Sequence, residues 1–333
     1  MIGIRVDMNP IIATGHIMRC LSIADAVKES GKEVIFFTAD DYPLELIKQR
    51  GHEAVVLGTN WQKMEEELPC FLELIAKMNI GSILVDSYQV TNDYLQSLKE
   101  NVQVAYLDDL DQFFYPVDKL ICYANYYNIF SYGSQTEKEG YYLGMKYVPL
   151  RKAFQNSAAK RINKRVENVL LLSGGSDSYG ILERMTDLFK KNTEITLTVV
   201  CGSFYKNYDE LVEKYKNYPN LVFCRNISNI EDYMRKADLA ISAGGTTLYE
   251  LCAVGTPTIS YSFVDNQLYT VKQFERDGLI AYAGDVRTED IFANVMALFE
   301  QYKDNDSLRQ ERSIKMQQMV DGKGAKRIAE SLF

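Results

Sequence analysis

His16 is the side chain of this sequence best suited to proton transfer. The chain has only two histidines, and His16 lies where the loop after the first predicted strand becomes a helix. An imidazole there can take a proton from water near neutral pH. Arg19, about one helical turn further on, shares the same helix face. A capping or packing role is the alternative for His16, whereas His52 lies in a turn and is assigned no role.

Carboxylates and a tyrosine follow other predicted strands of the first half. Asp7 comes directly after such a strand, and Asp86 with Tyr88 and the pair Asp108-Asp109 stand at the ends of two others. Because parallel strands end at one edge of a sheet, we expect these side chains near His16. The carboxylates could hold sugar hydroxyls or orient the imidazole. They could equally cap the helices that follow, which is the commoner use of Asp after a strand.

Two glycine-rich turns in the second half are suited to binding phosphate. They are Gly174-Gly175, and Gly244-Gly245 followed by Thr246, Thr247 and Glu250. Each turn joins a buried strand to a helix, and the first N–H groups of a helix lack partners. Glu250 lies where a carboxylate can accept hydrogen bonds from ribose hydroxyls. The alternative is two ordinary turns, with Asp177 capping one helix and Glu250 complementing the dipole of the other.

The elements that must position these residues alternate between strands and helices. In the first half, apolar runs predict strands at 2–6, 34–38, 54–57, 82–86, 103–108 and 119–123, and residues 124–150 are expected to be irregular. After a charged stretch at 160–164, strands are predicted at 168–172, 195–200, 221–224, 239–242 and 258–261. The expected fold class is therefore α/β, with two Rossmann-like domains and an interdomain cleft at their strand ends.

Length and composition exclude several classes of protein. A chain of 333 residues exceeds the usual size of a single core, and 47% apolar residues exclude a disordered chain. The net charge of −8, with no basic stripe, disfavours a nucleic-acid partner. Six scattered cysteines, no signal peptide and no long apolar run predict a cytoplasmic protein without membrane insertion. No cluster of metal ligands is evident, so neither a metal nor another cofactor is expected.

Several motifs occur in the order typical of one enzyme family. They are Thr14-Gly-His-Ile-Met-Arg-Cys20, Val85-Asp-Ser-Tyr88, Leu107-Asp-Asp109, Tyr147-Val-Pro-Leu-Arg151, Ser173-Gly-Gly-Ser-Asp177, and Ser242-Ala-Gly-Gly-Thr-Thr-Leu-Tyr-Glu250 with Asp265-Asn-Gln267. Together they resemble the UDP-sugar hydrolases of pseudaminic acid biosynthesis and the related spore-coat polysaccharide biosynthesis proteins. The last motif is also similar to that of the glycosyltransferase that adds N-acetylglucosamine to the peptidoglycan lipid precursor.

The resemblance implies a GT-B fold and a role for each matching residue. We expect a sugar-binding and catalytic domain at 1–152, a nucleotide-binding domain at 153–312, and a terminal helix at 313–333 packing back on the first domain. His16 is implied to be catalytic. The implied sugar-binding residues are Asp7, Gly15, Arg19, Tyr88, Asp109, Asn125 and Arg151. The implied nucleotide-binding residues are Gly174, Gly175, Gly244, Gly245, Thr246, Thr247, Glu250, Asn266 and Gln267.

The function expected from the sequence is hydrolysis of a UDP-linked deoxy-aminosugar at its anomeric carbon, without a metal and with inversion. His16 would activate the water, and amides of the glycine-rich turns would stabilise the departing UDP. The family commonly has Asp-His-Tyr where this chain has Asp86-Ser87-Tyr88, so the sugar could differ. The alternatives are a glycosyltransferase with a UDP-sugar donor, a related sugar-nucleotide epimerase, and a non-catalytic binder. A UDP-sugar is the expected partner, and the chain is expected to be a monomer or a weak homo-oligomer.

Overall fold

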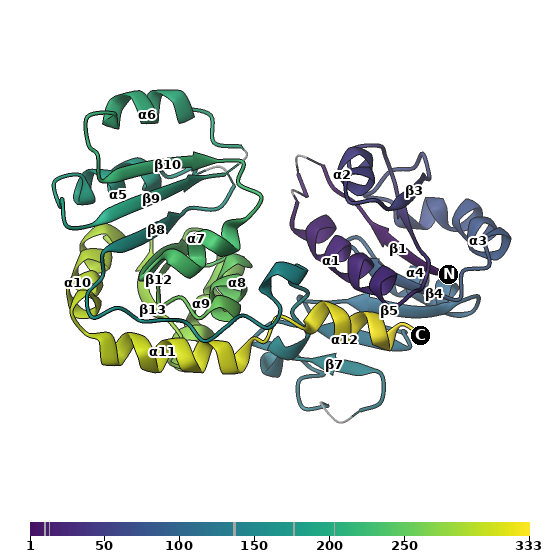
Figure 1. Cartoon of the computed structure of the whole chain (residues 1–333). Helices are drawn as coiled ribbons and strands as arrows, with labels where there is room; N and C mark the ends of the chain where they lie inside the picture. The colour runs from purple at the N-terminus through teal and green to yellow at the C-terminus, as the bar shows by residue number, and fades with distance from the viewer. Residues whose placement is uncertain (10, 13, 136–137, 176, 203) are drawn as a thin grey trace. The chain divides into compact units, whose positions relative to one another are not determined.

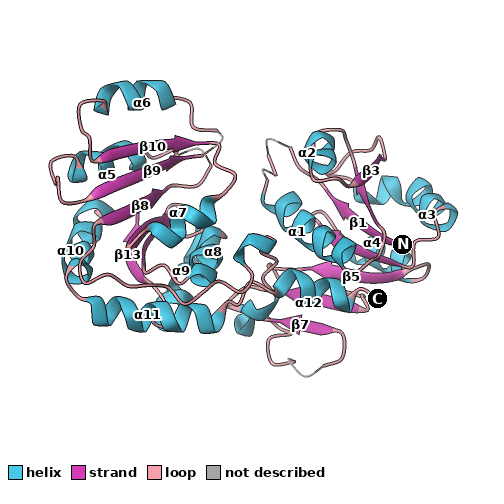
Figure 2. Cartoon of the chain, in the orientation of Figure 1, coloured by secondary structure: helices cyan, strands magenta, loops and turns pink. Residues whose placement is uncertain are grey.

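The chain forms two units, each built around its own sheet. The computed structural model describes residues 1–9, 11–12, 14–135, 138–175, 177–202 and 204–333. The first unit contains Met1–Gln155 and Gly322–Phe333, and the second contains Asn156–Asp321 (Figure 1). Each unit is a parallel sheet flanked by helices, so the predicted α/β fold of two Rossmann-like units is confirmed (Figure 2). The chain returns to the first unit at Gly322, later than the expected position 313.

The first unit has a seven-stranded sheet in the order β3-β2-β1-β4-β5-β6-β7, and its paired strands are parallel. The strands are β1 (Ile2–Val6), β2 (Val34–Thr38), β3 (Glu53–Val56), β4 (Ser82–Asp86), β5 (Gln103–Leu107), β6 (Lys119–Cys122) and β7 (Tyr141–Leu143). The helices are α1 (Gly15–Glu29), α2 (Leu44–Gln49), α3 (Leu68–Lys77), α4 (Asn92–Lys99) and α12 (Gly324–Ser331). Short 3-10 turns lie at Met64–Glu67, Tyr127–Ile129, Met145–Tyr147 and Lys152–Phe154.

Burial on both faces explains why these strands are continuous apolar runs. One face of the sheet, with Ile35, Phe37 and Ile83, packs in a single cluster with Phe71 of α3 and Leu95 of α4. Helix α12 packs along α1 in the same unit (Figure 1).

Glycine permits the close approach of α12 to the rest of the unit. A Cβ added to Gly324 would lie 2.1 Å from the carbonyl oxygen of Val148. Any larger residue at this position would therefore push the first turn of α12 away from the backbone that it contacts.

The second unit has a six-stranded parallel sheet in the order β10-β9-β8-β11-β12-β13. Its strands are β8 (Asn168–Leu172), β9 (Thr196–Cys201), β10 (Leu221–Arg225), β11 (Leu239–Ala243), β12 (Thr258–Ser262) and β13 (Ala281–Asp285). Its helices are α5 (Ile181–Phe189), α6 (Tyr208–Tyr215), α7 (Ile230–Lys236), α8 (Thr247–Val254), α9 (Asp265–Arg276), α10 (Ile291–Lys303) and α11 (Asp306–Met319). The described residues include no helix long and apolar enough to cross a membrane.

Strand order creates one switch point in each sheet. The chain reverses direction across the sheet between β1 and β4 in the first unit, and between β8 and β11 in the second. Ligands of such sheets bind beyond the carboxyl ends of the strands at this position. His16 lies beyond the end of β1, Asp86 is the last residue of β4, and the two glycine-rich turns follow β8 and β11.

Three local features differ from the prediction. The expected irregular segment 124–150 contains the short strand β7, whose three residues are too few to show a periodic pattern. Strand β13 was not predicted, because Tyr282 and Gly284 interrupt its apolar run. His52 is buried, although the sequence predicted a surface turn there: its ring packs on Phe36 and its Nε2 lies 2.7 Å from Asp25 Oδ1.

Candidate functional site

His16 is held by a buried carboxylate at the switch point of the first sheet. It lies in the first turn of α1, and its Nδ1 is 2.7 Å from Oδ1 of Asp86, the last residue of β4. Burial favours the neutral acid, but the charges of Arg19 and His16 outweigh it and hold the pKa of Asp86 well below its usual range. A carboxylate only accepts hydrogen bonds, so the contact requires a proton on Nδ1. In the neutral ring the lone pair is then on Nε2, as a general base needs.

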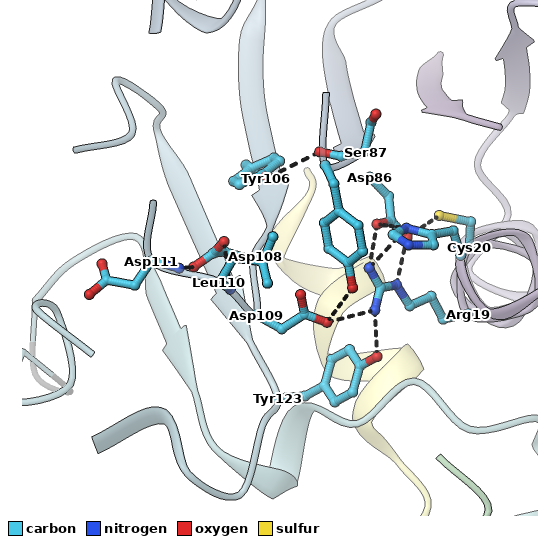
Figure 3. Close-up of polar contacts among 12 residues, drawn as sticks. Arg19, Cys20, Asp86, Ser87, Tyr106, Asp108, Asp109, Leu110, Asp111 and Tyr123 are labelled. Atoms are coloured by element: carbon cyan, nitrogen blue, oxygen red, sulfur yellow. Dashed lines mark hydrogen bonds and ion pairs between the residues drawn. The ribbon is translucent and has the colours of Figure 1, made fainter. Parts of the chain in front are cut away.

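Arg19 joins three elements of this site. Its Nε donates to Oδ2 of Asp86 over 2.6 Å, and its Nη2 donates to Oδ1 of the same carboxylate over 2.5 Å. Its Nη1 donates to the hydroxyl of Tyr123 over 2.7 Å and lies 3.4 Å from Oδ2 of Asp109 (Figure 3). The expected sugar-binding role of Arg19 therefore competes with four internal contacts, which fix its guanidinium inside the site.

Tyr88 lies against the imidazole at the more exposed side of this cluster. The rings of His16 and Tyr88 meet edge to face, with centroids 4.6 Å apart and planes at 82°. The Tyr88 hydroxyl donates to Oδ2 of Asp109 over 3.1 Å. Burial, then the charge of Asp109, raises the pKa of Tyr88. Tyr88 is partly exposed, so a ligand that reaches His16 can contact its ring.

The other residues predicted to bind the sugar have varied surroundings. Asp7 is buried, with one oxygen 2.7 Å from Arg5 Nη1 and the other accepting from the amide of Ala39. Gly15 begins α1, and a Cβ there would meet no described atom within 4 Å. Asn125 is buried shortly after β6, and the Arg151 guanidinium lies over the Phe154 ring.

Asp86 and Tyr123 were not among the predicted site residues. Asp86 was one of several carboxylates at strand ends that could hold sugar hydroxyls, orient His16 or cap a helix, and the pairing of β4 with β1 is what brings it to His16. Tyr123 follows β6 and is nearly buried, and burial raises the pKa of its hydroxyl to about 12. Its position at the end of a predicted strand was the signal that the sequence offered.

In the second unit, the turn after β11 leads into the N-terminus of helix α8. The amides of Leu248 and Tyr249 donate to the carbonyls of Gly245 and Thr246, which leaves the preceding amides of Thr246 and Thr247 at the N-terminus of α8. A Cβ added to Gly245 would meet no described atom within 4 Å. The amides of this turn can therefore be approached by a ligand.

The first turn of α9 adjoins the same glycines. A Cβ on Gly244 would lie 2.3 Å from Val271 Cγ1 and 3.3 Å from Gln267 Cβ, so only glycine allows this packing. Gln267 Oε1 accepts from the amide of Phe263 over 3.0 Å, whereas Asn266 is exposed. The predicted residues Gly244, Gly245, Thr246, Thr247, Asn266 and Gln267 thus lie close together, and Glu250 is in the first turn of α8.

The turn after β8 differs from the one after β11. Asp177 accepts from the amides of Ile181 and Leu182 over 2.8 and 3.0 Å, so the capping alternative holds for this residue. The N-terminus of α5 is therefore occupied by a carboxylate of the protein. Gly174 and Gly175 are exposed, and a Cβ on Gly202 would lie 2.3 Å from the Gly174 carbonyl oxygen. Gly202, which the sequence analysis did not single out, is therefore needed for the packing of this turn.

Among the described residues, no group of three or more His, Cys, Asp or Glu side chains is arranged to hold a metal ion. The described charged residues around His16 are instead paired with one another. This cluster can orient an imidazole, and the second unit offers backbone amides to an anion.

Comparison with known proteins shows what parts of this chain are similar to. Residues 169–330 match the model of the glycosyltransferase family 28 C-terminal domain. The spore coat polysaccharide biosynthesis protein SpsG of Bacillus subtilis is 23% identical over 99% of this chain and 97% of its own length. A UDP-N-acetylglucosamine–N-acetylmuramyl-(pentapeptide) pyrophosphoryl-undecaprenol N-acetylglucosamine transferase of Helicobacter pylori is 30% identical over 56% of this chain and 55% of its own length.

A further relative carries the activity that the sequence predicted. The pseudaminic acid cytidylyltransferase and UDP-2,4-diacetamido-2,4,6-trideoxy-beta-L-altropyranose hydrolase of Helicobacter pylori is 25% identical over 80% of this chain, but only 45% of its own length is covered. The chain spans about half the length of several of these curated relatives.

Solved structures define the fold. MurG of Acinetobacter baumannii superposes with a TM-score of 0.73 at 13% identity, covering 99% of this chain and 98% of that chain. CalG4, the calicheamicin glycosyltransferase, superposes with a TM-score of 0.69 at 13% identity, covering 99% and 96%. The chain therefore has the GT-B glycosyltransferase fold.

The predicted hydrolase activity is wrong. The matched family model is that of a glycosyltransferase domain, and the similar sequences and structures include transferases. These findings favour the transferase alternative over the hydrolase. Both activities use a nucleotide-sugar site, which explains why the glycine-rich turns alone did not separate them.

Proposed function

We propose that this protein is a glycosyltransferase that moves a sugar from a UDP-sugar donor to a hydroxyl of a carbohydrate acceptor. The observation that carries the proposal is the match of residues 169–330 to a glycosyltransferase domain, which contains the turn after β11 with its open amides. UDP and a carbohydrate acceptor are supported by the printed names of the relatives, among them a UDP-N-acetylglucosamine transferase and a polysaccharide biosynthesis protein.

In this proposal His16 is the general base. Its Nε2 takes the proton of the acceptor hydroxyl while that oxygen forms a bond to the anomeric carbon of the donor. The bond between this carbon and the diphosphate oxygen breaks, and its electron pair leaves with UDP. Asp86 holds the ring through Nδ1, and Tyr88 forms the wall that a carbohydrate contacts beside it. A single displacement of this kind inverts the anomeric configuration.

The leaving diphosphate is assigned to the second unit. Amides of Thr246 and Thr247 at the N-terminus of α8 are suited to stabilise the charge that grows on it. Glu250 is the proposed partner of the ribose hydroxyls, and Asn266 and Gln267 are proposed to contact the diphosphate or the donor sugar. Gly174 and Gly175 are proposed to approach the nucleotide through their backbone.

The proposal is tested by measuring release of UDP from UDP-sugars with and without acceptors. The donors are UDP-N-acetylglucosamine, UDP-glucose and UDP-linked deoxy-aminosugars, and the acceptors are a panel of monosaccharides, aryl glycosides and polyprenyl-diphosphate sugars. We expect release that depends on one of the acceptors, together with a glycoside product of inverted configuration. Equal release with and without every acceptor, or no binding of UDP in calorimetry, would contradict the proposal.

A further inference from the structure

The imidazole of His16 touches a positive charge as well as a negative one. Its Nδ1 is 2.7 Å from Oδ1 of Asp86, but it is also 3.1 Å from Nη2 of Arg19. Both nitrogens are donors toward the same carboxylate oxygen. A ring that gains a second proton would therefore place its new charge beside the guanidinium.

We propose that Arg19 is a positioning residue that offsets the charge of Asp86, so that this carboxylate orients the ring of His16 through Nδ1 while Nε2 keeps its lone pair. The proposal rests on the assignment of His16 as the base of the proposed transferase. A lone carboxylate beside an imidazole favours the doubly protonated ring, which has no lone pair for catalysis. Arg19 cancels most of this effect while Asp86 still orients the ring.

The surroundings of Arg19 suit this role. Tyr123 and Asp109 hold its Nη1, and its side chain is only 11% exposed, so it cannot turn away to pair with a substrate without breaking internal contacts. Burial opposes its charge, but Asp86 and then Tyr123 outweigh burial and raise the pKa of Arg19 well above its usual value. The guanidinium is therefore a permanent charge at every pH of interest.

Among the residues that the structure describes, the following titratable or charged groups meet the ring or its immediate partners. They are Arg19 and Cys20 of α1, Asp86 at the end of β4, Tyr88 after β4, Asp109 after β5 and Tyr123 after β6. Burial raises the pKa of Cys20, Tyr88 and Tyr123, so these three remain neutral near pH 7. The balance at the ring is therefore set by Arg19 against Asp86, with Asp109 on the far side of Arg19.

The second histidine of the chain provides an internal comparison. His52 Nε2 lies 2.7 Å from Oδ1 of Asp25, and Arg50 pairs with Oδ2 of that carboxylate. The same three residue types thus meet at both histidines, but through opposite ring nitrogens. The contacts predict the Nδ1–H form for neutral His16 and the Nε2–H form for neutral His52. Because the chain has two histidines, a histidine-selective NMR spectrum contains the signals of these two imidazole rings alone.

The experiment is NMR of the full chain labelled with ¹⁵N-histidine, titrated from pH 5 to 9, as wild type, Arg19→Met, Arg19→Lys and Arg50→Met. We expect the Nδ1–H form for His16 in the wild type. Arg19→Met should raise the titration midpoint of His16 by about one pH unit or more, because the imidazolium gains the carboxylate without the guanidinium. Arg19→Lys keeps the positive charge, so the titration midpoint of His16 should shift less than in Arg19→Met. Arg50→Met is the matched control, which should move His52 and leave His16 unchanged.

Either of two results would overturn the proposal: an Nε2–H form of His16 in the wild type, or an unchanged or lower midpoint in Arg19→Met. Unchanged His52 signals report that the Arg19 variants are folded, and unchanged His16 signals report the same for Arg50→Met. If Arg19→Met does not fold, the wild-type form and the smaller shift of Arg19→Lys decide instead. None of these measurements needs turnover, so they stand apart from the test of the transferase. If the wild type shows turnover, the acid limb of its pH profile for acceptor-dependent UDP release should move to higher pH in Arg19→Met, together with the titration midpoint of His16. A merely structural effect of the substitution would instead lower the activity at every pH.

Discussion

Two adjacent glycines follow β11, and substituting each with alanine tests a different role of this turn. The added methyl group at Gly244 tests packing, and the added methyl group at Gly245 tests ligand binding. In Gly244→Ala the added Cβ would lie 2.3 Å from Cγ1 of the buried Val271. Valine is stiff about its first torsion, so the overlap must be relieved by movement of α9, at about 1–3 kcal/mol of unfolding free energy. In Gly245→Ala the Cβ meets no described atom within 4 Å, so the free energy of unfolding should change by less than about 1 kcal/mol.

Gly245→Ala is expected to affect the binding of UDP and not the stability of the fold. The Cβ of Gly245→Ala would project into space that the described residues leave empty, and we expect a diphosphate oxygen to approach the amide of Thr246 through this space. Loss of one hydrogen bond to a charged group costs about 1.5–3 kcal/mol of binding free energy, which raises the dissociation constant roughly 10- to 150-fold. We therefore expect Gly245→Ala to be stable but to bind UDP poorly.

The assays are urea unfolding and titration calorimetry with UDP. Gly81→Ala is the matched control, because the nearest atom to its Cβ would be 4.0 Å away, in the first unit. It should change neither stability nor UDP affinity appreciably. Wild-type affinity in Gly245→Ala would refute the assignment of the diphosphate to this turn, and wild-type stability in Gly244→Ala would refute the packing argument.

Three further predictions concern the first unit. His16→Gln should lower acceptor-dependent UDP release by about 10²–10⁴-fold with UDP affinity unchanged in calorimetry, because glutamine cannot take up the proton. Asp86 has a lowered pKa, so it contributes stability above about pH 4 that is lost as the pH falls toward its folded value. Asp86→Asn should therefore be less stable at pH 7, by about 3–5 kcal/mol for a buried ion pair left without one partner, and should lose less stability on acidification, as measured by urea unfolding from pH 7 to pH 3. An acid dependence as steep as in the wild type would exclude Asp86 as its source. Gly324→Ala should loosen α12, because its Cβ would lie 2.1 Å from the Val148 carbonyl oxygen. Hydrogen exchange should then be faster in α12 and in α1, which it contacts, and unchanged protection would contradict this.

Much of the architecture could be predicted from the order of apolar runs and turns. The runs at β4 and β11 are apolar along most of their length, as strands covered on both faces must be. The glycine-containing loop after β1 marked where α1 begins. The sequence therefore placed His16 at a helix N-terminus, near the end of a strand. Glycine pairs after β8 and β11 likewise marked two turns where the backbone can approach a ligand.

The activity and the role of single residues were harder to predict. A nucleotide site serves hydrolases and transferases alike, so the residues that bind UDP do not specify which molecule attacks the sugar. Asp177 looked like part of a phosphate site or a cap, and only the structure showed its oxygens on the amides of α5. Gly202 looked like an ordinary turn residue until the structure placed it against the Gly174 carbonyl.

Tertiary structure decided which strands are neighbours, and with it the candidate site of the first unit. Periodicity reports that a strand is buried but not which strand lies beside it, because burial depends on each residue's own polarity and pairing depends on how the whole chain crosses the sheet. Asp86 is distant from His16 in the sequence, and β4 beside β1 brings their side chains to 2.7 Å. The same pairing puts Arg19 between two carboxylates, where it contacts the protein's own charges. The sequence alone therefore determined the types of residue present and the element that carries each, whereas the fold determined their partners.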